Sequence, residues 1–391
     1  MKEYKLSKGW TIFMYVAATV MIALFGWLLV IPFQDSGAQA KLGWFLVPLS
    51  LVMIAVMVGG MWDAYKRRFI IQADRLTSVG IFSTRELRLE EIKGYRVKDK
   101  YIAVEPSVPG KKQLRVSEYL GGYHEIQSWL SERYADLDAV AVQEQEQVML
   151  EDERLGVTKE ERAAKLLKAR KVCTTLNLVS AAVALWVMFF PAPYSLSVVL
   201  AIALPVVGLA VLRLYRGFIW IDDRKSSGYP SLGLTFILPA VALVLRALLD
   251  YDIFDHSHLW KPAGIVAAVF LVLLLFKQGA FFFKRASDYW SAVVVGLFLL
   301  GYSYGVVVHI NCYYDPASPQ HFTAEVLAKR KSSSKRSTSY YLHLSAWGPQ
   351  NTDEESSVGR DLYQRVEEGD TVHIYFRPGK LAIPWFVVSD R

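Results

Sequence analysis

Two short stretches of this sequence carry residue types that perform chemistry in other proteins. The first, Gly301-Tyr302-Ser303-Tyr304-Gly305, fits G-x-S-x-G, the strand-turn-helix elbow that presents a nucleophilic serine in many hydrolases. The same residues fit G-x-x-x-G, which allows two membrane helices to approach closely. Because Ser303 lies inside a long apolar run, we predict that Gly301 and Gly305 serve helix packing and that Ser303 is not a nucleophile.

The second stretch is a polar loop with His256 and His258, which are residue types that bind metal ions. Three aspartates accompany them: Asp250, Asp252 and Asp255. Two histidines in a short loop lack the fixed scaffold that holds metal ligands in place, and an ordinary solvated loop has the same composition. We therefore predict no metal site, no catalytic residues and no cofactor.

A third candidate site is basic and would bind lipid. It consists of four lysines in the loops of one polar segment: Lys98, Lys100, Lys111 and Lys112. Loop lysines are attracted to an anionic membrane surface without a built site, and this interpretation is favoured over recognition of a specific headgroup. Membrane lipids are the predicted partner. The net charge of +7 does not indicate nucleic acid, because most of the excess flanks apolar runs.

These candidates are positioned by seven long apolar runs. Most of the runs can cross a hydrocarbon core of about 30 Å, which takes roughly 20 helical residues. They lie near residues 11–33, 43–62, 172–190, 195–212, 232–249, 262–277 and 291–309. The sequence therefore predicts an α-helical integral membrane bundle of about seven transmembrane helices.

Basic residues gather on every second connection between the runs. The first run follows Lys2, Lys5 and Lys8, and the later basic connections are residues 66–68, 165–171, 213–225 and 277–285. Connections rich in lysine and arginine stay in the cytoplasm. We therefore expect a cytoplasmic N-terminus and, after an odd number of spans, an extracytoplasmic C-terminus.

One charged residue stands inside an apolar run. Arg246, in the fifth run, would cost roughly 2.5–3.5 kcal/mol at the centre of a spanning helix. It lies near the outer end of the run and Asp250 follows one turn later, so the sequence predicts an interfacial ion pair. The other six runs lack ionisable residues in their central portions, which disfavours an ion-coupled transporter.

The segment between the second and third runs has the pattern of a small folded domain. Residues 68–117 alternate apolar and polar side chains between turn signals such as Asp74, Gly94 and Pro109-Gly110. This pattern predicts short antiparallel strands. A helix over 122–137 follows, with apolar residues at helical spacing that would close the open end of the sheet.

Six or seven short strands followed by one amphipathic helix resemble a pleckstrin-homology-like (PH-like) domain, in its bacterial form beside membrane helices. The resemblance covers about residues 63–138 and also rests on Leu89-Glu90-Glu91-Ile92 before a strand. It implies a cytoplasmic binding or assembly module in a bacterial inner membrane, not a catalyst. Relatives that bind inositol phosphates use basic residues in the first hairpin, which we assign to residues 72–75 and which lacks a basic cluster here.

Residues 139–171 form a charged, helix-prone linker. Gly156 predicts the end of one helix, and Thr158 with Glu161 fits the capping box at the start of the next. The second helix would continue into the third span. A simple linker is the favoured interpretation, and a partner-binding segment is the alternative.

The C-terminal residues 310–391 are polar and rich in strand signals. We predict strands over 321–328, 340–347, 371–376 and 381–388, with a short helix over 361–366, which together make a small extracytoplasmic all-β domain. Residues 329–339 are basic and predict a solvated loop, with contact to anionic lipid or to an envelope polymer as the alternative.

The chain thus divides into five predicted segments. They are an N-terminal transmembrane hairpin (1–62), a cytoplasmic PH-like domain (63–138), a charged helical linker (139–171), a five-helix transmembrane region (172–309) and an extracytoplasmic β domain (310–391). Cys173 and Cys312 fall on opposite sides of the membrane in this arrangement and cannot pair.

The favoured function is a non-enzymatic membrane scaffold or sensor that makes protein or lipid contacts on both membrane faces. Its protein partners would bind the PH-like domain and the C-terminal domain. The alternative is a transporter or channel for a small solute. A membrane-embedded enzyme is the least favoured function, because Ser303 and the His256 and His258 loop are its only indications.

Overall fold

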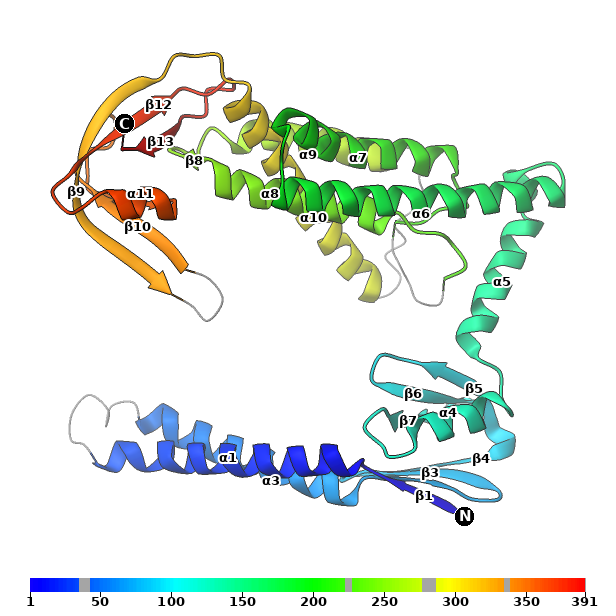
Figure 1. Cartoon of the computed structure of the whole chain (residues 1–391). Helices are drawn as coiled ribbons and strands as arrows, with labels where there is room; N and C mark the ends of the chain where they lie inside the picture. The colour runs from blue at the N-terminus through cyan, green and yellow to red at the C-terminus, as the bar shows by residue number, and fades with distance from the viewer. Residues whose placement is uncertain (35–42, 222–226, 276–285, 334–337, 391) are drawn as a thin grey trace. The chain divides into compact units, whose positions relative to one another are not determined.

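The computed structural model describes residues 1–34, 43–221, 227–275, 286–333 and 338–390. The basic connection 277–285 and part of 213–225 lie outside the described residues, as do 334–337 of the predicted basic loop. The chain divides into two compact units, which are treated separately below (Figure 1). The N-terminal unit comprises Met1–Val148 with Lys225–Gly228, and the C-terminal unit comprises Met149–Arg224 with Tyr229–Arg391.

Six helices in the described residues are long and apolar enough to cross a membrane. They are α1 (Lys8–Gln34), α3 (Gly43–Lys66), α6 (Lys159–Phe189), α7 (Tyr194–Leu214), α8 (Gly233–Asp250) and α10 (Ala286–Tyr313). The predicted run 262–277 corresponds to α9 (Trp260–Leu275), an apolar helix of 16 residues. The chain is therefore a multi-pass helical membrane protein that also contains β-sheet regions.

In the N-terminal unit, α1 and α3 lie side by side as a hairpin (Figure 1). The Tyr15 hydroxyl donates a hydrogen bond to the Met61 carbonyl at 3.4 Å. Most large apolar side chains of the pair are exposed, for example Trp44 at 80%. An exposed apolar surface of this extent is expected of helices that face lipid.

A four-stranded antiparallel sheet adjoins this hairpin. Its order is β1 (Lys2–Lys5), β2 (Arg68–Ile71), β3 (Arg75–Val79) and β4 (Thr84–Arg88). Strand β1 is not predictable from the sequence, because four residues with one buried side chain, Tyr4, carry almost no strand signal. The predicted boundary at residue 62 therefore cuts across one sheet, and residues 72–75 connect the second and third strands.

A second, three-stranded sheet packs against the first. It contains β5 (Ile92–Val97), β6 (Tyr101–Pro106) and β7 (Leu114–Ser117), and a one-turn helix, η1 (Leu89–Glu91), precedes it. Helix α4 (Tyr123–Ser131) buries Ile126 and Leu130 completely in the core that the two sheets share.

The predicted helix over 122–137 is wrong at its C-terminal end. Residues 132–134 form a turn, and Ala135 and Asp136 then pair with the edge of β5, where the Tyr95 amide donates to the Ala135 carbonyl at 3.1 Å. A new helix, α5 (Leu137–Glu151), begins after them.

Helix α6 begins as the capping signal predicts. The Thr158 hydroxyl accepts a hydrogen bond from the Glu161 amide at 3.2 Å. The Glu161 carboxylate turns back to the amide of Val157, one residue before the cap (3.0 Å). Gly156 ends the short helix η2 (Glu153–Leu155), so the predicted stop at this glycine is also present.

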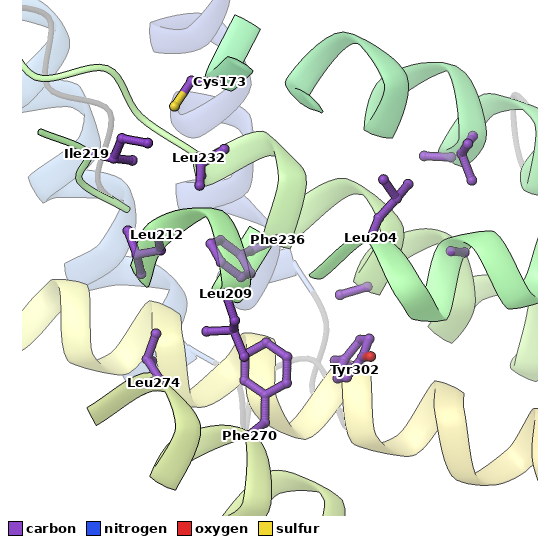
Figure 2. Close-up of a cluster of buried hydrophobic side chains, with 14 of the residues drawn as sticks. Cys173, Leu204, Leu209, Leu212, Ile219, Leu232, Phe236, Phe270, Leu274 and Tyr302 are labelled. Atoms are coloured by element: carbon purple, nitrogen blue, oxygen red, sulfur yellow. The ribbon is translucent and has the colours of Figure 1, made fainter. Parts of the chain in front are cut away.

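The helices of the C-terminal unit surround a large apolar core, and a smaller apolar cluster lies at the end of the bundle next to the β12–β13 loop. Figure 2 shows Phe236 of α8, Phe270 of α9 and Tyr302 of α10 turned toward one another. The Tyr302 hydroxyl donates to the Ile202 carbonyl of α7 at 2.6 Å, just before Pro205. This hydrogen bond ties α10 to α7 one turn before the proline.

The C-terminal sheet has the order β11 (Glu354–Val358), β10 (Thr338–Leu344), β9 (Gln320–Ser333), β12 (Thr371–Arg377), β13 (Trp385–Ser389) and β8 (Asp252–Ile253). Helix α11 (Arg360–Arg365) matches the predicted short helix. The predicted loop over residues 329–339 is wrong in its described part. Residues 329–333 are the end of β9 and pair with residues 338–342 of β10. Strand β8 comes from the link between α8 and α9, so the sheet is built partly from the bundle's own chain.

Candidate functional site

Ser303 lies in the interior of α10, which excludes the nucleophile elbow, since that motif needs a strand before the serine. Its side chain is 1% exposed. The Ser303 hydroxyl makes no hydrogen bond within the described part of the chain, so no base is positioned to activate it. The geometry gives Ser303 no catalytic role.

The two glycines that flank Ser303 face α8. A Cβ atom on Gly305 would lie 2.7 Å from the Leu243 Cβ and 3.0 Å from its carbonyl carbon, whereas a Cβ on Gly301 would meet only the Val244 Cγ2 at 3.3 Å. The backbones of α8 and α10 therefore approach most closely at Gly305, where any side chain would collide with backbone atoms.

The His256 and His258 loop remains an ordinary polar turn. The Ser257 hydroxyl and amide both bond to the Asp255 carboxylate, at 2.6 and 2.8 Å. His258 lies 3.9 Å from the same carboxylate, and both histidines are exposed. The described residues contain no group of three or more His, Cys, Asp or Glu side chains suited to a metal ion.

A polar cluster occupies one end of the bundle, where α8 and α10 meet α7. It consists of Tyr194, Arg246, Asp250 and His309, and is called the polar cluster below. Arg246 pairs with Asp250 at 3.2 Å, as the sequence predicts. The Tyr194 hydroxyl donates to the same carboxylate at 2.8 Å, so Asp250 joins the first residue of α7 to the last of α8.

His309 is fully buried beside this ion pair. Its Nδ1 donates to the Gly305 carbonyl at 2.7 Å, and its Nε2 has no partner among the residues that the structure covers. The ring lies against those of Tyr194 and Tyr251, with centroids 6.1 and 5.8 Å away. Gly305, where the backbones of α8 and α10 approach closely, and the buried His309 are therefore one helical turn apart.

The end of α10 is bonded to the loop between β12 and β13 of the C-terminal sheet. The Asn311 side chain donates to the Ile383 carbonyl at 2.8 Å and accepts from the Leu381 amide at 2.9 Å. Asn311 is completely buried. Gly379, in the left-handed region at φ 75°, leaves room for this amide, because a Cβ there would overlap it.

Asp315 makes the second set of contacts between α10 and the sheet. Its carboxylate accepts from the Gly379 amide at 3.0 Å and from the Trp385 indole at 3.2 Å. Trp385 in turn packs edge-on against Tyr251, which follows α8, with centroids 5.5 Å apart. Asn311 and Asp315, at and just after the end of α10, are together called the α10 junction; they hold the β12–β13 loop and Trp385, and Trp385 adds the contact to Tyr251 after α8.

Strand β8 adds an acidic residue to the same region. Asp252 pairs through its backbone with Phe386 of β13. Burial raises the pKa of the Asp252 carboxyl to about 6, since a charged carboxylate is poorly solvated there. The edge of the sheet that meets the bundle therefore carries a group that titrates near neutral pH.

The four candidate lysines do not form one cluster. Lys98 and Lys100 lie in the turn between β5 and β6, and Lys111 and Lys112 lie in the turn between β6 and β7. These turns are at opposite ends of β6, about 20 Å apart for a strand of this length. A single headgroup cannot contact both pairs.

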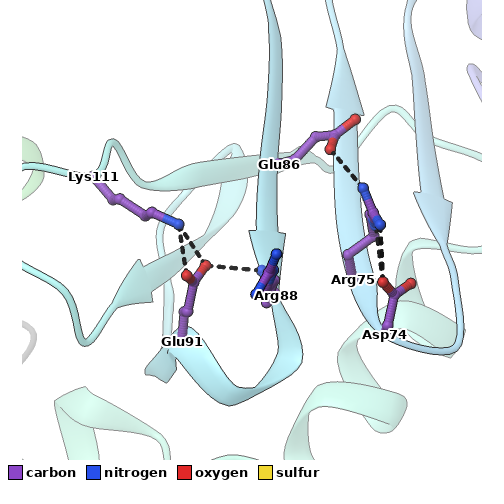
Figure 3. A network of polar contacts seen from close by, with 6 residues as sticks. All are labelled: Asp74, Arg75, Glu86, Arg88, Glu91 and Lys111. Carbon is purple, nitrogen blue, oxygen red and sulfur yellow. Dashed lines mark hydrogen bonds and ion pairs between the residues drawn. The ribbon is translucent and has the colours of Figure 1, made fainter.

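Lys111 is also engaged in an ion pair. Figure 3 shows its ammonium group directed at both carboxylate oxygens of Glu91, at 2.6 and 2.7 Å. The hydrogen bond with Lys111 lowers the pKa of the Glu91 carboxyl. Glu91 also accepts from the Arg88 amide at 3.1 Å, which fixes the corner between the two sheets.

No family model, no curated protein and no solved structure matches this chain. Tyr194, His309 and Asn311 are not among the residues predicted from the sequence. The signal for them is positional, since all three are polar residues at the end of an apolar run, where a spanning helix meets its surroundings.

Proposed function

We propose that this chain is a non-enzymatic membrane scaffold or sensor whose helices couple a domain on one face of the membrane to a domain on the other. The observation that carries the proposal is the α10 junction with strand β8. The buried Asn311 amide, the half-buried Asp315 carboxylate and the pairing of β8 with β13 attach the C-terminal sheet to the ends of α8 and α10, so we infer that the sheet moves with these helices. A domain on a flexible tether would not need such contacts.

The N-terminal unit would be the second coupled domain. Its four-stranded sheet, three-stranded sheet and closing helix α4 support the proposed resemblance to PH-like binding modules. We infer that it binds protein or lipid. The loops and strands of the C-terminal sheet would bind a protein partner on the other face.

The orientation is part of the proposal. The α8–α9 link and the C-terminal sheet lie together, since β8 pairs with β13. Helix α9 begins next to the C-terminal sheet, and α10 ends next to it. This arrangement supports α9 as a seventh span, because the chain must cross and return between the two points. The basic connections then favour a cytoplasmic N-terminal unit and an extracytoplasmic C-terminal sheet in a bacterial inner membrane.

Cysteine labelling tests the orientation. In a Cys173→Ala, Cys312→Ala background, single cysteines at the exposed positions Lys112 and Asn351 are treated with an impermeant thiol reagent on intact spheroplasts. We expect label at 351 only, and label at both positions after lysis. Label at 112 in intact spheroplasts would reverse the assignment.

Isolation in mild detergent tests the scaffold function. We expect a protein partner at near-stoichiometric yield, and a reduced yield from an Asn311→Leu, Asp315→Asn variant that still folds. Asn351→Leu, at an exposed position, is the matched control. A stoichiometric small solute or ion, with no protein, would instead support the transporter, for which the buried His309 is the best structural indication.

A further inference from the structure

The sheet of the N-terminal unit has one end that faces the membrane. The register aligns Lys5, Arg68, Val79 and Thr84 in one row across β1 to β4. Helix α1 begins at Lys8, just after this row, and α3 ends at Lys66, just before it. Both spans therefore leave from this end of the sheet.

The turn between β3 and β4 projects from the same row in the same direction. It is closed by a hydrogen bond from the Gly80 amide to the Ser83 carbonyl at 3.0 Å. At its tip Phe82 is 95% exposed, and Ile81 is half-buried beside it. A phenylalanine that is almost fully exposed at the tip of a turn is expected where another apolar phase covers it.

A second turn lies at this end. The Glu118 amide donates to the Lys100 carbonyl at 3.0 Å, and the Ser7 amide donates to the Tyr119 carbonyl at 2.8 Å. These bonds put the Lys98–Lys100 turn beside the start of α1. Trp10 in the first turn of α1 stacks on Tyr119, with centroids 4.0 Å apart, and such residues favour the membrane interface.

We propose that the N-terminal unit rests directly on the membrane that α1 and α3 cross, with Phe82 inserted into the lipid interface and Lys98 and Lys100 against anionic headgroups. These three residues are called the membrane rim below. This inference deepens the lipid-contact part of the proposed function and rests on it. Lys111 and Lys112 are not part of the rim, because they lie at the other end of β6.

The two components of the rim support each other. Helices α1 and α3 already hold the β3–β4 turn at the bilayer surface. Phe82 can therefore insert without a separate membrane-binding step. Each lysine near an anionic surface increases the bound population about fivefold. In zwitterionic lipid this contribution disappears, whereas the insertion of Phe82 remains.

The test uses the full chain, in the Cys173→Ala, Cys312→Ala background, reconstituted in nanodiscs of phosphatidylcholine with or without phosphatidylglycerol. A spin label is attached at Phe82→Cys or, for comparison, at the exposed Val108→Cys in the β6–β7 turn. Collisions with oxygen report lipid, and collisions with a soluble nickel complex report water. We expect oxygen to dominate at 82 and nickel to dominate at 108.

Charge reversal separates the lysines from the phenylalanine. Lys98→Glu with Lys100→Glu should raise the nickel accessibility at 82 several-fold in anionic nanodiscs and leave it unchanged in zwitterionic ones. The matched control is Lys93→Glu with Lys112→Glu, which makes the same charge change at exposed positions toward the other end of β6.

Two results would overturn the inference. Equal nickel accessibility at 82 and 108 would mean that the turn stays in water. An equal effect of both lysine pairs would mean that general charge, not the rim, holds the unit. The accessibility measurement needs no protein partner. Copurification could therefore fail to support the scaffold function while the spin label still shows the membrane rim in lipid. A partner could equally be found while the label shows the rim in water.

Discussion

The contact between Gly305 and α8 gives the sharpest prediction of bundle stability. Replacing Gly305 by alanine puts a methyl group 2.7 Å from the Leu243 Cβ and 3.2 Å from the Val244 amide nitrogen. Leu243 is completely buried, so neither it nor the α8 backbone can move aside without disturbing the core. Overpacking of this kind costs about 1–3 kcal/mol.

Gly301→Ala is the matched control. Its methyl group would meet only a side-chain atom of Val244 at 3.3 Å, and a side chain can rotate away. Both changes gain the same helix propensity of about 1 kcal/mol. The difference between the two variants therefore isolates the backbone contact at Gly305, and we expect it to be about 1–3 kcal/mol.

The assay is thermal unfolding of the purified chain in one mild detergent. For a unit of this size, 1 kcal/mol shifts Tm by about 2–4 °C. Gly305→Ala should therefore unfold about 2–12 °C below Gly301→Ala. Ser303→Ala should not lower Tm, because the buried Ser303 hydroxyl has no hydrogen-bond partner among the described residues and its removal leaves none of them unsatisfied.

Equal Tm values for the two glycine variants would refute the argument, since they would show that the helices do not touch where the structure brings them together. A Ser303→Ala variant that folds normally but loses an activity would revive the hydrolase interpretation.

Three further predictions concern the sheets. Burial raises the pKa of Asp252 from 3.8 to about 6. The protonated carboxyl therefore contributes stability that is fully present below about pH 4 and is lost as the pH rises through 6. Asp252→Asn should raise Tm at pH 7.5 but not at pH 4. Asn311→Leu leaves the Ile383 carbonyl and the Leu381 amide unpaired, so it should cost about 1–3 kcal/mol and speed proteolysis between α10 and β9, unlike Asn351→Leu. Gly94→Ala should destabilise the N-terminal unit by about 1–3 kcal/mol, because the new Cβ would lie 2.6 Å from the Ala135 carbonyl oxygen. Gly59→Ala is the control and should not destabilise it, because no atom lies within 4 Å of a Cβ there. Chemical denaturation followed by circular dichroism distinguishes the two variants.

The sequence predicts the features whose signal is local. The apolar runs become helices, and Thr158 caps α6, because hydrophobic length and capping chemistry are properties of consecutive residues. The Arg246 and Asp250 ion pair follows for the same reason, as one helical turn separates the two residues.

The features that the sequence hides depend on distant partners. Strands β1 and β8 are too short to show an alternation, and each exists only because a sheet edge far along the chain pairs with it. Asn311 gains its role from Leu381 and Ile383, which arrive through tertiary folding. The lysines were grouped by sequence proximity, whereas the strand between the two pairs carries them to opposite ends.

The pairing of β1 with β2 also sets an order of assembly during synthesis. The ribosome makes β1 first, yet its partner appears only after α1 and α3 have been made. Insertion of α1 and α3 side by side brings Lys5 next to Arg68, so that β1 can pair with β2. Without the inserted helices, a long flexible segment would have to bring the two strands together at an entropic cost. A chain whose hairpin fails to insert keeps an open β2 edge, which proteases and other chains can reach. Correct insertion is thereby linked to survival of the newly made protein.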